Sequence, residues 1–193
     1  MTQELRIPPR YLLWVSNFYP YKRAALALAA FAALPPELRA RNPLVLAGGD
    51  WQGGLARARW EAARLGVERD TRFLGWVDDG WLPALYRHAR AHISASAEET
   101  FGRNVLEAMA CGCPNLLQDL PVLREVTGGA AWLTDFVQQG IAADALREMC
   151  VNDATTARLR TQGIVQAGRF SFVRLARERL AAILPLLVGC SPE

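Results

Sequence analysis

Two acidic side chains with a glycine between them form the part of the sequence best suited to chemistry. Glu99 and Glu107 stand eight residues apart and flank Gly102. Residues 91–94 have the pattern of a short buried strand and residues 103–111 that of a helix, so Gly102 is expected where a helix begins. A helix N-terminus presents unpaired backbone N–H groups and a partial positive charge, which suit a phosphate. The predicted order is carboxylate, anion site, carboxylate.

A nucleotide-sugar has the complementary order of groups: a sugar diol, a diphosphate and a ribose diol. A carboxylate can accept two hydrogen bonds at once, so Glu99 and Glu107 could each bind one pair of hydroxyls. Two carboxylates beside a phosphate would otherwise repel the ligand, and we therefore interpret them as diol-binding groups. The alternative is an ordinary surface helix start, where the helix dipole favours acidic residues. Spacing alone leaves both interpretations open.

Lys22 is the only lysine among 22 lysine and arginine residues. A lysine is a compact point charge, whereas an arginine is a planar fork, so a lone lysine invites a specific explanation. It follows the strand predicted at residues 11–15, and ligands in open α/β sheets gather at the carboxyl ends of strands. Lys22 is therefore predicted to reach the same crevice as Gly102. The alternative is one exposed lysine retained by chance.

Composition and charge exclude several classes of protein. With 193 residues, 51% hydrophobic and 21% charged, the chain is expected to be one globular domain spanning residues 1–193. It has no apolar run of the roughly 18 residues that a membrane span needs and no signal-peptide core, which predicts a cytoplasmic protein. A net charge of +3 without a basic stripe argues against nucleic acid as a partner.

The cysteine pattern does not predict a metal site. Cys111 and Cys113 are close in sequence, but no second pair and no nearby histidine completes a ligand set. We interpret these cysteines, together with Cys150 and Cys190, as buried free thiols.

Six short apolar runs alternate with amphipathic stretches, which is typical of an α/β, Rossmann-like, doubly wound and mainly parallel sheet with helices on both faces. The expected strands span residues 11–15, 44–47, 71–74, 91–94, 115–118 and 131–133. The expected helices between them span residues 24–34, 55–65, 81–89, 103–111 and 121–126. Residues 141–150, 155–167 and 172–187 then form helices only, the last a helical C-terminal tail whose apolar residues we expect in the core.

Three common catalytic or phosphate-binding motifs are missing from the sequence. It contains neither a dinucleotide fingerprint after a strand, nor a phosphate loop ending in Gly-Lys-Ser/Thr, nor a Gly-x-Ser-x-Gly nucleophile elbow. The pair Pro35-Pro36 and the pair Gly48-Gly49 indicate turns. Gly102 therefore remains the candidate phosphate site.

The run from Glu99 to Pro114 is similar to the signature of the retaining glycosyltransferases of family 4. Those enzymes have two Rossmann-like domains, the GT-B fold, and the signature belongs to their C-terminal, donor-binding domain. The resemblance extends over nearly the whole chain, through residues 12–31, 45–49, 72–77, 82–86 and 125–128.

The resemblance implies a role for each matching residue. Glu99 would contact the transferred sugar, and Lys22 would neutralise the leaving diphosphate. The expected donor-binding residues are Asn17, Arg23, Gly75, Trp76, Val77, Phe101, Gly102, Arg103, Leu106 and Glu107. Among these, Glu107 would bind the ribose, the main chain near Gly102 the diphosphate, and the main chain near Trp76 the base. No metal is expected, because basic groups and the helix terminus stabilise the departing phosphate.

Two departures from the family pattern affect the predicted site. Ser16-Asn17 stands where relatives often carry Gly-Arg, so one phosphate-binding arginine is missing, and Arg23 and Arg103 are the candidates to replace it. Asn104 replaces a proline found in many relatives, which we expect to loosen the helix start.

The resemblance implies a hexosyltransferase that acts on a glycan or lipid acceptor, and residues 20–23 favour mannose from GDP-mannose. Nothing before Tyr11 could encode the acceptor domain, which usually supplies a catalytic histidine. We therefore expect that domain in cis or in trans, little transfer by this chain alone, and peripheral association of the whole enzyme with the inner face of the membrane. Two alternatives stay open: a non-catalytic nucleotide-sugar-binding partner or sensor, and half of another GT-B enzyme such as a nucleotide-sugar epimerase.

Overall fold

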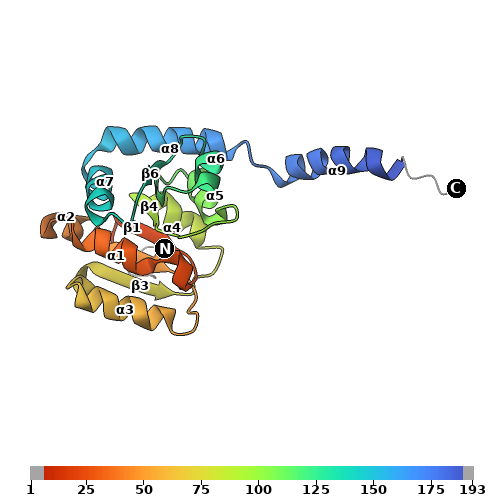
Figure 1. Cartoon of the computed structure of the whole chain (residues 1–193). Coiled ribbons are helices and arrows are strands. Elements are labelled where there is room, and N and C mark those ends of the chain that lie inside the picture. The colour runs from red at the N-terminus through yellow and green to blue at the C-terminus, as the bar shows by residue number, and fades with distance from the viewer. Residues whose placement is uncertain (1–6, 189–193) are drawn as a thin grey trace.

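The computed structural model describes residues 7–188, so Cys190 lies outside the described part of the chain. One parallel sheet of six strands forms its centre, in the order β3-β2-β1-β4-β5-β6 (Figure 1). The strands are β1 Leu12–Val15, β2 Leu44–Ala47, β3 Thr71–Gly75, β4 Ala91–Ser94, β5 Asn115–Gln118 and β6 Trp132–Thr134. The predicted α/β, Rossmann-like fold is confirmed.

The order of the strands determines where a ligand can bind. From β1 the chain proceeds outward to β2 and β3, then returns to the other side of β1 for β4, β5 and β6. In open parallel sheets, ligands bind outside the carboxyl ends of the strands at the point where the order reverses. Here that point lies between β1, which precedes Lys22, and β4, which precedes Glu99.

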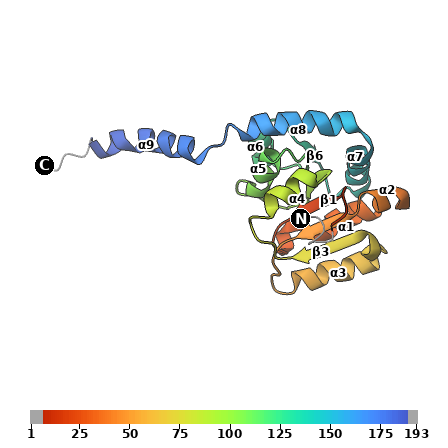
Figure 2. The same cartoon turned by 180° about the vertical axis from the view of Figure 1, so that it is seen from behind.

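Helices cover both faces of the sheet because successive side chains along each strand point to opposite faces. Leu12 and Trp14 pack in one core cluster with α1, α3 and α7, whereas Leu13 packs in another with α4 and α5. Figure 1 and Figure 2 show these two layers from opposite sides. The helices are α1 Ala24–Ala32, α3 Gly54–Arg64, α4 Leu82–His88, α5 Arg103–Ala110, α6 Pro121–Thr127, α7 Gln139–Val151 and α8 Asp153–Ala167, with short 3-10 turns η1 Pro20–Lys22 and η2 Glu68–Asp70.

The short helix α2 (Pro36–Arg41) was not predicted, because Pro35-Pro36 indicated only a turn. Pro36 occupies the first helical position, where the fixed φ of proline and its missing N–H suit a helix start. Arg39 then holds the helix in place by donating from Nη1 to the carbonyl oxygen of Leu34 at 2.6 Å. The proline pair therefore ends one helix and begins the next.

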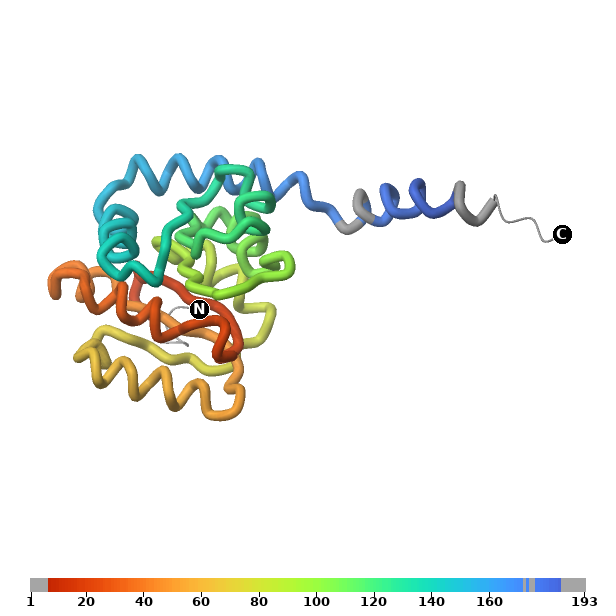
Figure 3. The backbone as a smooth tube through the Cα atoms, in the orientation of Figure 1, coloured from red at the N-terminus to blue at the C-terminus, as the bar shows by residue number. Residues whose placement is uncertain are grey.

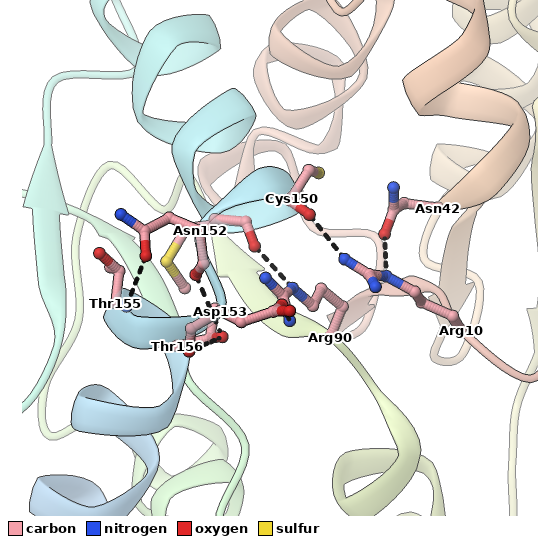
Figure 4. A network of polar contacts seen from close by, with 9 residues as sticks. Arg10, Asn42, Arg90, Cys150, Asn152, Asp153, Thr155 and Thr156 are labelled. Atoms are coloured by element: carbon pink, nitrogen blue, oxygen red, sulfur yellow. Dashed lines mark hydrogen bonds and ion pairs between the residues drawn. The ribbon is translucent and has the colours of Figure 1, made fainter.

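The edge of the sheet opposite the carboxyl ends is tied together by arginines (Figure 4). Arg10 and Arg90 each precede a strand, and both donate to carbonyl groups in the last turn of α7. Arg10 donates to the Cys150 carbonyl at 2.6 Å, and Arg90 donates to the Met149 carbonyl at 2.7 Å. Arg90 also pairs with Asp153 at 2.5 Å. Cations at a helix C-terminus satisfy its unpaired carbonyls and oppose its dipole. The arginines at this edge are structural.

The last helix, α9 (Phe172–Val188), extends away from the sheet and its covering helices (Figure 3). The prediction that its apolar residues belong to the core is wrong for Ile183 and Leu184, whose exposed fractions are 49% and 53%. The side chains of Leu175, Leu186 and Leu187 lie outside the described part of the structure. Amphipathic periodicity shows that a helix has an apolar face, but not whether a partner for that face is present. Among residues 7–188, no helix combines the length and the apolar character that crossing a bilayer requires.

Candidate functional site

The carboxyl ends of the central strands border a cleft of about 500 Å³, lined by the loops that follow β1, β2, β3 and β4 and by the start of α5. Residues of the predicted site that line it are Asn17, Lys22, Trp76, Val77, Glu99, Phe101, Gly102, Arg103 and Glu107. The structure thus brings together predicted residues from three separate segments of the chain, which follow β1, β3 and β4. Their roles stay predictions.

Three residues of the predicted set do not line this cleft. Arg23 lines a separate hollow with Tyr19 and Arg57, and Leu106 lines an adjoining apolar groove of about 250 Å³. Gly75 lies at the end of β3, and its carbonyl accepts a hydrogen bond from the Gly48 N–H at 2.7 Å. This bond joins the loops that follow β2 and β3. Of the two arginines considered as replacements for the missing one, only Arg103 reaches the cleft.

Lys22 and Glu99, which both line the cleft, form a close ion pair. The Lys22 Nζ lies 2.6 Å from Glu99 Oε1, and the two side chains are only 12% and 8% exposed. The backbone joins the same two loops, since the Ala97 N–H donates to the Tyr21 carbonyl at 2.7 Å. A buried charge is costly unless it is paired, so each group stabilises the other until a ligand competes for it. The sequence predicted a shared crevice for these residues but not this contact.

Gly102 begins helix α5 in the left-handed region, with φ of 81°. A Cβ at this position would lie 2.8 Å from Leu123 Cδ2, which is the end of a side chain and can shift, so the backbone conformation is the main reason for glycine here. Residues 101–104 line the cleft at the positive end of the helix dipole. The predicted anion site therefore has the expected local structure.

Asn104 strengthens the start of α5, contrary to the expectation that it loosens it. Its Nδ2 donates to the Val15 carbonyl at 3.0 Å, and its Oδ1 accepts from the Val105 N–H at 3.0 Å. A proline at this position has no side-chain amide and could make neither bond. The asparagine thus fastens the helix to the end of β1.

Glu107 lies one turn into α5, on the wall of the cleft. Its pKa is raised, chiefly because partial burial removes water from the charged form. Arg103, whose Nη2 lies 3.9 Å from Glu107 Oε1, acts to lower the pKa of Glu107, and Asp79 acts to raise it. The charged form of Glu107 therefore lowers the stability of the folded protein, which is common for groups in a binding or active site.

We expect Glu107→Gln to raise the free energy of unfolding near neutral pH. The folded-state pKa of Glu107 lies above its ordinary value of 4.5, so the folded protein favours the neutral carboxyl group. The folded state therefore loses stability as the pH rises from 4.5 through the raised pKa and the group becomes charged. Urea unfolding at about pH 7 and about pH 4 tests this, because the gain should appear only at the higher pH.

Glu61→Gln is the matched control. Its pKa is lowered, chiefly by the hydrogen bond from Arg64, so its contribution to stability has the opposite sign and the variant should be less stable at neutral pH. Equal effects of Glu107→Gln at both pH values would contradict the raised pKa.

Sequence reasoning missed Tyr21, Asp79, Leu82 and Thr100, which also line the cleft. Each stands next to, or a few residues from, a predicted site residue in a loop at the carboxyl edge. Their position next to predicted site residues was the available signal, but sequence position does not show which side chains face the cleft.

The described cysteines are free thiols, as predicted. Cys113 and Cys150 are also buried, and burial raises their pKa values to about 12 and about 11. The prediction of burial is wrong for Cys111, which is partly exposed. Within residues 7–188, no three His, Cys, Asp or Glu side chains gather in a way that could hold a metal ion. The expectation of metal-free chemistry stays a prediction.

The family model described as "Glycosyl transferases group 1" matches residues 3–166. The chain belongs to this family. Among curated relatives, the O-antigen chain mannosyltransferase B of Escherichia coli is 32% identical over 182 residues, covering 89% of this chain and 45% of the relative. The chain thus spans about half the length of such a relative.

Solved structures show the same fold. Sucrose-phosphate synthase from Thermosynechococcus elongatus superposes with a TM-score of 0.85 at 23% identity, over 98% of this chain and 49% of that one. Anabaena Alr3699/HepE, solved in complex with UDP and glucose, gives a TM-score of 0.81 at 24% identity, over 95% and 50%. At these identities the likeness shows the fold, and this group 1 chain superposes on about half of each solved chain.

Proposed function

We propose that this chain binds the nucleotide-sugar donor of a retaining hexosyltransferase. One observation carries the proposal: the Lys22–Glu99 pair, the N-terminus of α5 and Glu107 all line the same cleft. Cation, helix terminus and carboxylates match the diphosphate and the two diols of such a donor. The UDP and glucose found in the Anabaena structure support this class of ligand.

Each group has a defined part in the proposal. Glu107 accepts hydrogen bonds from the ribose hydroxyls, and Glu99 from the hydroxyls of the transferred sugar. Lys22 and the backbone N–H groups near Gly102 stabilise the negative charge that develops on the leaving diphosphate. Trp76, which is 72% exposed on the cleft wall, stacks on the base.

Arg103 supplies the positive charge of the missing arginine, and Asn17, which stands at that arginine's position, does not replace it. The Asn17 Oδ1 is occupied by the Gly49 N–H at 2.9 Å, so this side chain serves the loops. The Arg103 side chain is 83% exposed at the cleft, and because its contact with Glu107 is long, 3.9 Å, it can turn toward a phosphate. A guanidinium can donate to two phosphate oxygens at once.

The donor sugar we propose is mannose, carried by GDP, because the relative in E. coli is named a mannosyltransferase and residues 20–23 favour that donor. The proposed acceptor is a glycan, held by a second domain that is supplied in cis or in trans. Transfer takes place on the cytoplasmic side, at the inner face of the membrane, and this chain alone transfers little sugar.

We expect Glu107→Ala to weaken binding of the matching nucleotide by about 10- to 100-fold, because two hydrogen bonds to an ionised acceptor are lost. Calorimetric titration with GDP, UDP, ADP and GDP-mannose measures the effect and identifies the base. Glu37→Ala, in the first turn of α2 and outside the cleft lining, is the control and should bind like the parent. Unchanged affinity of Glu107→Ala, or no binding of any nucleotide to the folded parent, would refute the proposal.

A further inference from the structure

A buried tyrosine behind the wall of the cleft has a hydroxyl without a hydrogen-bond partner. Tyr86 belongs to α4 and is only 1% exposed, and its hydroxyl oxygen is buried and makes no hydrogen bond. Buried polar groups are nearly always hydrogen-bonded, so an exception calls for an explanation. Tyr11, also 1% exposed, follows the rule, because its hydroxyl donates to the Leu85 carbonyl at 2.7 Å.

The packing of α4 against α5 directs the Tyr86 hydroxyl toward the cleft. Both helices begin at the carboxyl edge of the sheet, after β3 and β4, and they contact one another. Tyr86 packs in one cluster with Leu82 of its own helix and Ala108 of α5. A long side chain on a helix points back toward the helix N-terminus. The Tyr86 ring therefore lies toward Leu82, which lines the cleft together with Glu107.

The ring of Tyr86 is held in place by His92 of β4. The two rings meet edge to face, with centroids 5.7 Å apart and planes at 83°. His92 is itself fully buried, and its Nδ1 donates to Asn115 Oδ1 at 2.7 Å. The hydroxyl is thus positioned by a helix and a central strand before a ligand binds, which lowers the entropic cost of using it.

Electrostatic effects identify Glu107 as the group that this hydroxyl faces. Burial is the main reason that the pKa of Tyr86 lies well above 10, and the Glu107 carboxylate raises it further. In return, the Tyr86 hydroxyl acts as a hydrogen-bond donor that lowers the pKa of Glu107, against the larger effect of burial. Arg103, 3.9 Å away and 83% exposed, approaches the same carboxylate from the solvent.

We infer that Tyr86 is a positioning residue, whose hydroxyl donates to Glu107 and holds that carboxylate toward the ribose of the nucleotide. The inference rests on the proposed function, because it concerns how Glu107 binds the ribose. A carboxylate has about four acceptor sites, so one hydroxyl from the protein leaves room for both hydroxyls of the ribose. A turn of the Glu107 side chain completes the hydrogen bond and gives the Tyr86 hydroxyl the partner it lacks.

Calorimetric titration of Tyr86→Phe with GDP, UDP and ADP, and with their 2′,3′-dideoxy forms, tests the inference. For the base that binds, we expect the ribonucleotide to bind about three- to tenfold more weakly, the worth of one hydrogen bond, and the dideoxy form to change by less than about twofold. The dideoxy form offers Glu107 no hydroxyls, so the orientation of the carboxylate no longer matters. Tyr11→Phe is the matched control, because it removes a hydroxyl from an equally buried tyrosine, and it should bind both forms like the parent.

A second variant distinguishes positioning from a general effect on packing. Because Tyr86 acts through Glu107, adding Tyr86→Phe to Glu107→Ala should cause no further loss of ribonucleotide affinity. A disturbed core would instead weaken both forms of the nucleotide and would add to the effect of Glu107→Ala. Tyr86→Phe should unfold at the same urea concentration as the parent, since its hydroxyl has no hydrogen bond to lose.

The outcomes separate this inference from the proposed donor site. A parent and a Tyr86→Phe variant that prefer the ribonucleotide to the same degree would overturn the role of Tyr86 and leave the donor site intact. Equal losses for the ribose and dideoxy forms in Tyr86→Phe would also overturn it. A folded parent that binds no nucleotide, or binds both forms equally, would refute the ribose site at Glu107 and the role of Tyr86 with it.

Discussion

Lys22→Met should lower the affinity for the matching nucleoside diphosphate by about 10- to 150-fold, which corresponds to one or two charge-assisted hydrogen bonds of about 1.5–3 kcal/mol in total. The same change should lower the free energy of unfolding by about 1–3 kcal/mol, because the Glu99 carboxylate, only 8% exposed, loses the ammonium 2.6 Å away. Calorimetry measures the first effect and urea unfolding the second.

A double variant separates these two effects. In Lys22→Met with Glu99→Gln, no unpaired charge remains buried, so most of the lost stability should return. Diphosphate affinity should stay low, because the cation is still missing. Lys22→Arg is the complementary control: it keeps the charge but changes its geometry, and it should retain part of the affinity. Parent-like affinity in the double variant would show that Lys22 has no part in anion binding.

Gly48→Ala is the substitution for which we expect the largest loss of stability, about 3 kcal/mol or more. Gly48 has φ of 151°, and a Cβ there would lie 1.7 Å from the Ser16 carbonyl oxygen, which is backbone and cannot turn aside. The loops after β1 and β2 would have to separate, and the hydrogen bond that the Gly49 N–H donates to the Asn17 Oδ1 would be lost. For a domain of ordinary stability, such a loss is a large part of the total.

Urea unfolding followed by circular dichroism measures this loss. Gly140→Ala is the control, since a Cβ in that early turn of α7 meets nothing within 4 Å and alanine favours helices by up to about 1 kcal/mol. Gly140→Ala should therefore be as stable as the parent or slightly more so. A Gly48→Ala chain that unfolds at the same urea concentration as the parent would show that the two loops can separate without cost.

Much of this fold was determined by local sequence. Apolar runs of the length of a strand, separated by helical periodicity, specify an alternating α/β chain, and the parallel doubly wound sheet follows from the few ways such a chain can cover both faces. Gly102 was identifiable because a glycine between a strand and a helix has a conformational reason to be there. Since the carboxyl ends of parallel strands meet at one edge, Lys22, Glu99 and Glu107 could be assigned to one cleft before the structure was known.

Other features were decided only by the tertiary structure, because they depend on side-chain direction and on partners distant in sequence. Lys22 and Glu99 are 77 residues apart, and nothing local required their charges to touch. Arg23 is adjacent to Lys22 but faces a different hollow, because Arg23, directly after η1, has a left-handed conformation that turns the chain. Trp51 likewise contacts Tyr19 only because the loops after β1 and β2 pack together. Periodicity predicts which residues form the apolar face of a helix. Whether that face is buried depends on the rest of the structure, and in α9 Ile183 and Leu184 stay exposed.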